Sequence, residues 1–274
     1  MRPLAIDLFA GLGGWTEALL AEGYYVVGFD IERHEYGEHR YPGQLVIQDV
    51  LTLHGSQFSD AALIVASPPC QEYSYMAMPW KLAKAKAAAI RADTTGAELE
   101  RLNRLFDACF RIQKEASIAA ARHIQMVVEN VRGAIPWVGR SRWNFGSFHL
   151  WGDVPALMPF TSDRIKALGM HWHPTQGRNA GLKVSGFRFD GSGGSFQTAS
   201  VKISGGGANA EQPSISRLTS SKSPARKAAS TMIAKIPELL ALWIARVYMQ
   251  EYETVSIRGG SRSQSLDAFA RGAE

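Results

Sequence analysis

The chain has 274 residues, of which 46% are hydrophobic and 20% charged, with a net charge of +5. This composition is that of a globular protein with one large domain, or a large and a small one. No apolar run reaches the roughly 18 residues that a membrane-spanning helix needs. Two cysteines are too few for a disulfide framework, and the first residues lack the pattern of a secretion signal. We therefore expect a cytoplasmic protein with no membrane partner.

The first part of the chain alternates in the manner of β-α-β units. A helix is expected to begin at Trp15 and to end at Gly23. Short, apolar runs of this kind are typical of parallel strands that are covered on both faces. The predicted strands are residues 4–9, 24–30, 44–47 and 61–66.

The middle of the chain adds one long amphipathic helix, expected over residues 97–122. Residues 80–95, which are rich in lysine and alanine, are expected to be mobile. Further on, we expect two more strands, a continuous helix and a disordered tail. These elements are strands 125–130 and 148–151, helix 228–250 and tail 253–274.

One sector of the chain is strongly basic. Residues 131–227 carry 13 lysines and arginines against 4 acidic residues, a net charge of +9, and the remainder is mildly acidic. Within this sector, residues 155–227 are rich in glycine and serine and show no helical period. They predict a small, loop-rich, mainly β region. The charge favours a polyanionic partner, although a solvated basic loop region would have the same composition.

Asp-Leu-Phe-Ala-Gly-Leu-Gly-Gly at residues 7–14 follows the first predicted strand. Glycines between a strand and a helix let backbone N–H groups approach a ligand closely. The dinucleotide fingerprint G-x-G-x-x-G fails, because Thr16 stands where its last glycine would be. Asp30, at the end of the second strand, could accept hydrogen bonds from ribose hydroxyls or could cap a helix.

Cys70 lies in a polar loop directly after the strand 61–66, and two prolines precede it. This loop should lie at the carboxyl end of the sheet, where α/β proteins bind their ligands. Two prolines restrict the backbone and therefore the direction of the thiol, so Cys70 is a candidate nucleophile. Cys109, within the apolar stripe of helix 97–122, is expected to be a core residue.

Glu129 is placed at the end of the strand 125–130 and should reach the same crevice. Burial there would raise its pKa and let it hold a proton for acid–base chemistry. A loop or helix-capping carboxylate is the alternative interpretation of this residue alone.

In this order and spacing, the glycine turn, Pro-Pro-Cys-Gln and Glu-Asn-Val resemble the cytosine-C5 DNA methyltransferase family. The resemblance covers residues 3–152 and the helix 228–250. It implies an α/β, Rossmann-like methyltransferase sheet with a small, loop-rich, mainly β target-recognition domain. The catalytic domain would be residues 1–154 with 228–252, and the target-recognition region 155–227.

The resemblance also implies an activity and its partners. The chain would be a monomeric DNA (cytosine-5)-methyltransferase that acts on double-stranded DNA in a prokaryotic cell. It could be phage-encoded or part of a restriction-modification system. S-adenosyl-L-methionine would be the donor, S-adenosyl-L-homocysteine the product, and no metal would be needed.

By the same resemblance, Cys70 would attack C6 of a flipped cytosine while Glu129 holds a proton at N3. Phe9, Gly11 and Gly13 would bind the methionine part of the donor. Asp30 would bind its ribose, Ile31 its adenine ring and Asp49 the adenine amino group. The donor site as a whole would comprise Asp7, Phe9, Gly11, Gly13, Asp30, Ile31, Asp49, Val50 and Pro69.

The sequence also departs from the family. The usual Gln-x-Arg-x-Arg motif is missing, and Arg140 and Arg142, shortly after Glu-Asn-Val, are the nearest match. Arg142 would then hold the cytosine O2, unless both arginines contact phosphate. Ile-Pro at residues 236–237 stands where the family has Val-Pro. An RNA cytosine methyltransferase and an inactive DNA-binding relative are the alternative functions, but the Cys-Phe-Thr segment of the RNA branch is absent.

Overall fold

The computed structural model describes residues 2–36, 38–74, 80–158, 227, 231 and 234–252. The predicted target-recognition region 155–227 and the predicted tail 253–274 lie almost wholly outside these residues. The mainly β character of the first and the disorder of the second therefore stay predictions.

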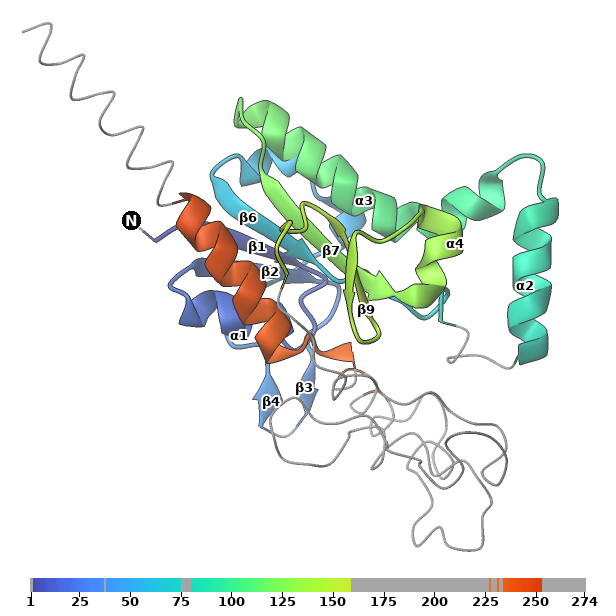
Figure 1. The fold of residues 1–274 in the computed structure, drawn as a ribbon, viewed down its shortest axis with the longest axis horizontal. Coiled ribbons are helices and arrows are strands. Elements are labelled where there is room, and N and C mark those ends of the chain that lie inside the picture. Colours follow the sequence, from blue (N-terminus) through green and yellow to red (C-terminus); the bar gives the residue numbers. More distant parts are fainter. Residues whose placement is uncertain are drawn as a thin grey trace, which may run out of the picture.

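Seven strands form one sheet in the order β5-β2-β1-β6-β7-β9-β8 (Figure 1). The first five are parallel, and β9 and β8 are antiparallel at one edge. The α/β class with a mostly parallel sheet is therefore confirmed. The strands are β1 Leu4–Leu8, β2 Tyr25–Asp30, β5 Gln44–Ile47, β6 Ala61–Ala66, β7 Gln125–Val131, β8 Trp143–Phe145 and β9 Phe148–Gly152.

The strand order reverses at β1, which pairs with β2 on one side and with β6 on the other. The chain runs outward from β1 through β2 to β5 and then returns to β6 on the opposite side. In open α/β sheets, such a reversal leaves a crevice at the carboxyl ends of the strands. The loops after β1, β2, β6 and β7 all meet at this edge.

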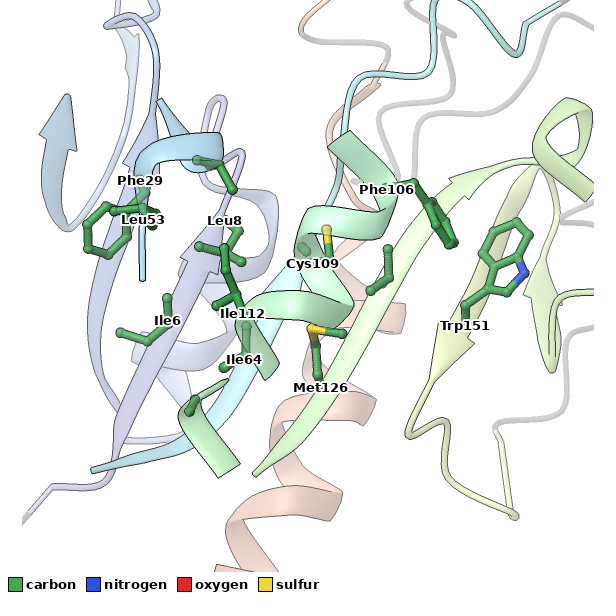
Figure 2. Packing of buried hydrophobic residues seen from close by; sticks show 14 of the residues in the cluster. Ile6, Leu8, Phe29, Leu53, Ile64, Phe106, Cys109, Ile112, Met126 and Trp151 are labelled. Carbon is green, nitrogen blue, oxygen red and sulfur yellow. The ribbon is translucent and has the colours of Figure 1, made fainter. Parts of the chain in front are cut away.

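Helices cover both faces of the sheet. On one face, Phe106, Cys109 and Ile112 of α3 pack toward Ile64 and Met126 of the strands (Figure 2). On the other face, α1 shares a second core with the helix formed by residues 238–252. Cys109 is fully buried, so its prediction as a core residue is confirmed. The helices are α1 Gly14–Ala21, α2 Trp80–Ala92, α3 Ala97–Ala119, α4 Ile135–Val138 and the helix 238–252.

Two predictions about local structure were wrong. Residues 80–95 were expected to be mobile, but Trp80–Ala92 form α2, because alanine and lysine favour a helix and Ala83 and Ala87 become buried. The helix predicted over 228–250 is interrupted: a bend at Lys235 and two non-helical residues precede the helix 238–252. Pro237 explains the break, since proline disfavours helical backbone at the residue before it.

The short elements were not predicted. β3 and β4, each of two residues, form a hairpin. One 3-10 turn follows β5, a second precedes β6 and a third follows β7. None of the helices in the described part of the chain is long and apolar enough to cross a membrane. The short elements are β3 Glu35–Tyr36, β4 His39–Arg40 and the turns Val50–Thr52, Gly55–Phe58 and Arg132–Ala134.

Candidate active site

The turn after β1 has an unusual backbone. Phe9, Gly11 and Gly13 all have positive φ angles, of 59°, 54° and 76°. For Phe9 this conformation costs energy, and strain of this kind gathers at ligand sites. Packing also requires glycine at position 13, because a Cβ on Gly13 would lie 2.4 Å from Cδ of Pro42. The turn therefore leaves the backbone of Gly11 partly exposed directly before α1, while Gly13 is buried against Pro42.

Asp30 holds this turn from the neighbouring strand. Its carboxylate accepts hydrogen bonds from the backbone N–H of Gly11, at 2.8 Å, and of Glu32, at 3.3 Å. Burial opposes the charge, but hydrogen bonds from His34, Gly11 and Glu32 outweigh it and lower the pKa of Asp30. The residues that follow Asp30 are not helical, so it is not a helix cap. An ionised carboxylate thus lies beside the glycine turn.

The other predicted donor residues lie at the same edge of the sheet. Gln48 donates its N–H to the carbonyl of Asp30, which keeps the ends of β5 and β2 together. Asp49 accepts a hydrogen bond from the N–H of Leu51 at 2.9 Å, and Val50 is buried. Ile31 is 68% exposed, a high value for an isoleucine next to this crevice. An apolar surface and two carboxylates therefore gather at the ends of β2 and β5.

Beneath the glycine turn lies a buried polar network. The hydroxyl of Thr16 donates to Oδ2 of Asp7 at 2.6 Å and is also hydrogen-bonded to the hydroxyl of Tyr41 at 2.6 Å. Burial raises the pKa of Asp7 to about 8, and the charge of Asp30 adds to the effect, against the hydrogen bond from Thr16. Oδ1 of Asp7 is buried without a partner among the described residues. Such an orphaned acceptor fits a bound polar group or a water molecule.

The loop that carries Cys70 is fixed at several points. At its start, Ser67 donates its N–H to the carbonyl of Leu8. Pro68 is buried, and its carbonyl accepts a hydrogen bond at 2.9 Å from the side-chain amide of Asn130. The carbonyl of Cys70 then accepts hydrogen bonds from the next turn of the loop. Pro69 is exposed and Cys70 is partly exposed. The thiol thus belongs to a rigid loop that solvent can reach.

Cys70 and Glu129 lie in one electrostatic environment. Burial raises the pKa of the Glu129 carboxyl to about 8, although a hydrogen bond from Ser67 lowers it in part. Burial also raises the pKa of the Cys70 thiol to about 11, and the charge of Glu129 contributes to this rise. The indole N–H of Trp15 in α1 donates to the Ser67 hydroxyl at 3.0 Å. This bond fixes the serine that is hydrogen-bonded to Glu129. At neutral pH both groups are therefore protonated in the free protein.

The two arginines lie on the segment that leads into β8. Arg140 and Arg142 are exposed at the start of β8, where the N–H of Arg142 donates to the carbonyl of Leu150. Burial raises the pKa of Tyr248, and the positive charge of Arg142 opposes this rise. The Tyr248 hydroxyl donates a hydrogen bond to the carbonyl of Asp153. Asp153 is hydrogen-bonded to Met126, near the amino end of β7 and away from Glu129. The charge of Arg142 therefore acts on groups that lie near the amino end of β7.

Four polar residues of the site were not predicted as functional. Asn130 has a visible signal, because a polar amide ends an apolar strand. Ser67 and Thr16 look like ordinary loop and helix residues, and Tyr41 reaches the network from a loop far along the chain. In the described part of the chain, no cluster of three or more His, Cys, Asp and Glu side chains could hold a metal ion.

Three solved structures match about half of the chain at low similarity. A protein of E. coli described as a prophage-encoded DNA modification methyltransferase is 22% identical, with a TM-score of 0.32 over 49% of this chain and 33% of its own. The Dnmt2 methyltransferase of S. pombe is 17% identical, with a TM-score of 0.31 over 50% and 37%. The methyltransferase EhMeth of Entamoeba histolytica is 15% identical, with a TM-score of 0.31 over 50% and 41%. The matched part thus spans only about a third to two fifths of these proteins.

No protein of curated function matches the chain in sequence. Residues 4–133, by contrast, match the family of C-5 cytosine-specific DNA methylases. The match contains the glycine turn, the Cys70 loop and Glu129, which are the parts of the fold that meet at one edge of the sheet. The chain therefore contains a C-5 cytosine-specific DNA methylase domain over residues 4–133.

Proposed function

We propose that the chain transfers a methyl group from S-adenosyl-L-methionine to C5 of cytosine in double-stranded DNA. The observation that carries the proposal is the pairing of Cys70 with Glu129. They extend from adjacent parallel strands, and the charge on one raises the pKa of the other. A thiol nucleophile and a protonated carboxyl are the two groups that addition to a cytosine ring requires. The family match supplies the reaction class.

The residues around the glycine turn fit the donor. The turn offers partly exposed backbone at Gly11, and Oδ1 of the buried Asp7 carboxyl, which has no partner among the described residues, could be hydrogen-bonded to a polar group. The ionised carboxylate of Asp30 could accept hydrogen bonds from ribose hydroxyls, and the exposed side chain of Ile31 offers an apolar contact. When bound, the donor supplies an electrophilic methyl group on sulfur. The proposed donor site comprises Asp7, Phe9, Gly11, Gly13, Asp30, Ile31, Asp49, Val50 and Pro69.

Cys70 would act as the nucleophile. Its sulfur would form a bond to C6 of the cytosine, and the thiol proton would pass to solvent, which reaches the partly exposed Cys70. The raised pKa makes the free thiol unreactive, so it must lose its proton after substrate binds. Protonation of Glu129 favours this step, because a neutral carboxyl no longer repels a thiolate.

Glu129 would act on the opposite side of the ring. With a pKa of about 8, it keeps its proton at neutral pH and can donate a hydrogen bond to N3. This contact neutralises the charge that enters the ring from sulfur and leaves C5 nucleophilic. Asn130 keeps the Cys70 loop beside β7 through its bond to Pro68, so the two groups hold a fixed relation. After transfer, a base removes the C5 proton and the Cys70–C6 bond breaks.

The cytosine must leave the base stack, because C5 and C6 are not accessible from either face within a duplex. Arg142, with Arg140 beside it, would bind either the flipped base at O2 or a phosphate. The basic region 155–227 would supply further phosphate contacts and the choice of sequence. It would form the target-recognition region, with residues 1–154 and 228–252 as the catalytic domain.

Transfer of a labelled methyl group tests the proposal. Purified chain is incubated with methyl-labelled donor and either duplex DNA or RNA of the same sequence, and the labelled base is then identified. We expect 5-methylcytosine in the DNA, lost in Cys70→Ser and kept in the matched variant Cys109→Ser. Label in RNA alone would instead identify an RNA methyltransferase. Donor binding without any transfer to nucleic acid would contradict the proposal.

A further inference from the structure

His34 faces the carboxylate of Asp30 from the loop after β2. Its Nε2 lies 3.7 Å from Oδ1 of Asp30, an ion-pair distance, and the two side chains are only 13% and 11% exposed. Shielding from solvent makes such a contact stronger than the same contact on the surface. Burial opposes the charge of Asp30, and His34 has the largest effect among the groups that offset burial and lower the pKa of Asp30. His34 therefore contributes most to keeping this carboxylate ionised.

Tyr36 determines which nitrogen of His34 carries the hydrogen. The Tyr36 hydroxyl, at the end of β3, lies 3.2 Å from Nδ1 of His34. An ionised carboxylate only accepts hydrogen bonds, so Nε2, which faces Asp30, carries a hydrogen. In the neutral imidazole Nδ1 is then the acceptor, and the Tyr36 hydroxyl donates to it. Tyr36 thus orients an imidazole whose N–H is directed at Asp30.

Glu32 lies on the other side of the imidazole but competes weakly for it. Its Oε1 is 3.6 Å from Nδ1 of His34, and its side chain is 41% exposed. Lys227 binds the other oxygen of the Glu32 carboxylate. Solvent and this lysine offset the charge of Glu32, so the more buried Asp30 is the stronger partner of His34.

The contacts of Asp30 fix its orientation and leave one position for a ligand. A carboxylate has about four acceptor positions. Contacts within the described part of the chain use three of them: the N–H of Gly11 at Oδ2, and the N–H of Glu32 and the imidazole of His34 at Oδ1. Oδ2 therefore retains a position for a ligand hydroxyl. Because the last torsion of an aspartate is soft, loss of His34 would let the carboxylate turn away from this direction.

We propose that His34, oriented by Tyr36, is a positioning residue that sets the Asp30 carboxylate for the ribose hydroxyls of the donor. This inference rests on the proposed function, because it takes the donor ribose as the ligand of Asp30. His34 acts only through Asp30. Loss of the imidazole therefore weakens binding of ligands that carry the ribose hydroxyls and does not affect ligands that lack them.

Calorimetry on the full chain without DNA tests this inference, with two probes: S-adenosyl-L-homocysteine and its 2′,3′-dideoxy analogue. His34→Ala should weaken binding of S-adenosyl-L-homocysteine by about threefold or more, less than the roughly tenfold or greater loss expected for Asp30→Ala. It should bind the dideoxy analogue as wild type does. In the Asp30→Ala background, His34→Ala should have no further effect, because the two residues act as one unit.

Three more variants separate positioning from a general effect on the fold, which circular dichroism monitors. His34→Gln, whose side-chain amide can replace the Nε2–H donor, should restore most of the affinity. Tyr36→Phe removes only the hydroxyl that orients His34 and should weaken binding by a smaller factor than His34→Ala. His39→Ala, which removes an exposed imidazole from the neighbouring strand β4, is the matched control and should bind both probes as wild type does.

The outcomes distinguish this inference from the proposed function. If wild type binds S-adenosyl-L-homocysteine and His34→Ala binds it equally well, only this inference is overturned. It is also overturned if His34→Ala loses the same affinity for both probes, adds its loss to that of Asp30→Ala, or is not improved by glutamine at position 34. If wild type does not bind S-adenosyl-L-homocysteine, the proposed function fails first and this inference fails with it.

Discussion

Glu129→Gln should make the protein more stable at alkaline pH. The pKa of Glu129 is raised from 4.5 to about 8 by burial, so the folded chain keeps a proton that the unfolded chain releases above pH 4.5. Stability therefore falls as the pH rises from 4.5 toward 8 and levels off above it. The loss is about 1.4 kcal/mol per pH unit within this window, or about 5 kcal/mol in all. Glutamine cannot ionise, so Glu129→Gln should abolish this pH-dependent loss of stability.

Urea unfolding from about pH 5 to about pH 8 measures the effect. Wild type and Glu129→Gln should be similarly stable at the acidic end, and the variant should be more stable by about 3 kcal/mol at the alkaline end. A residual slope should remain in the variant, because burial also raises the pKa of Asp7 to about 8. Glu100→Gln, which removes an exposed carboxylate of α3, is the control. Parallel curves for wild type and Glu129→Gln would refute a buried, protonated Glu129.

Three further predictions concern ligand binding. Asp30→Ala should weaken donor binding by about 1.5–3 kcal/mol in calorimetry without DNA, as expected for a lost hydrogen bond to a charged group; unchanged affinity would leave Asp30 only the role of holding the glycine turn. Arg142→Ala should slow methyl transfer with unchanged DNA affinity if it holds the base, and a lower salt slope would instead identify a phosphate contact. Replacing three basic residues of the target-recognition region by alanine should weaken binding to all DNA sequences and flatten the salt slope by up to about three, without affecting donor binding. An unchanged slope would mean that the DNA does not contact this region. The three residues to be replaced, which lie outside the described part of the chain, are Arg164, Lys183 and Arg188.

The central sheet could be predicted because its strands are buried on both faces and read as apolar runs. β1, β2, β5, β6 and β7 all lie within two residues of their predicted bounds. The hairpin of β3 and β4 could not be predicted, since two polar residues per strand carry no period. The interruption near Pro237 is different: the proline was visible, but the apolar period continued across it. The predicted helix followed the apolar period and ignored the restriction that Pro237 places on the backbone of the residue before it.

The meeting of Cys70 and Glu129 could be predicted, because parallel strands bring their carboxyl ends to one edge of the sheet. The pairing of β8 with β9, beside which the N–H of Arg142 donates to the carbonyl of Leu150, could not be predicted, since a strand of three residues carries too little periodicity. The network of Asp7, Thr16 and Tyr41 was also beyond prediction. Tyr41 comes from a loop without periodicity, and only packing beneath the glycine turn brings its hydroxyl to Thr16.

Covalent trapping on 5-fluorocytosine tests the role of Cys70 most directly. The fluorine at C5 cannot leave as a proton does, so the reaction should stop after methyl transfer with the Cys70–C6 bond intact. With donor present, wild type and Cys109→Ser should form an adduct with duplex DNA that survives denaturation in SDS. Cys70→Ser should form none, although it still binds donor and DNA. An adduct that persists in Cys70→Ser would contradict the account.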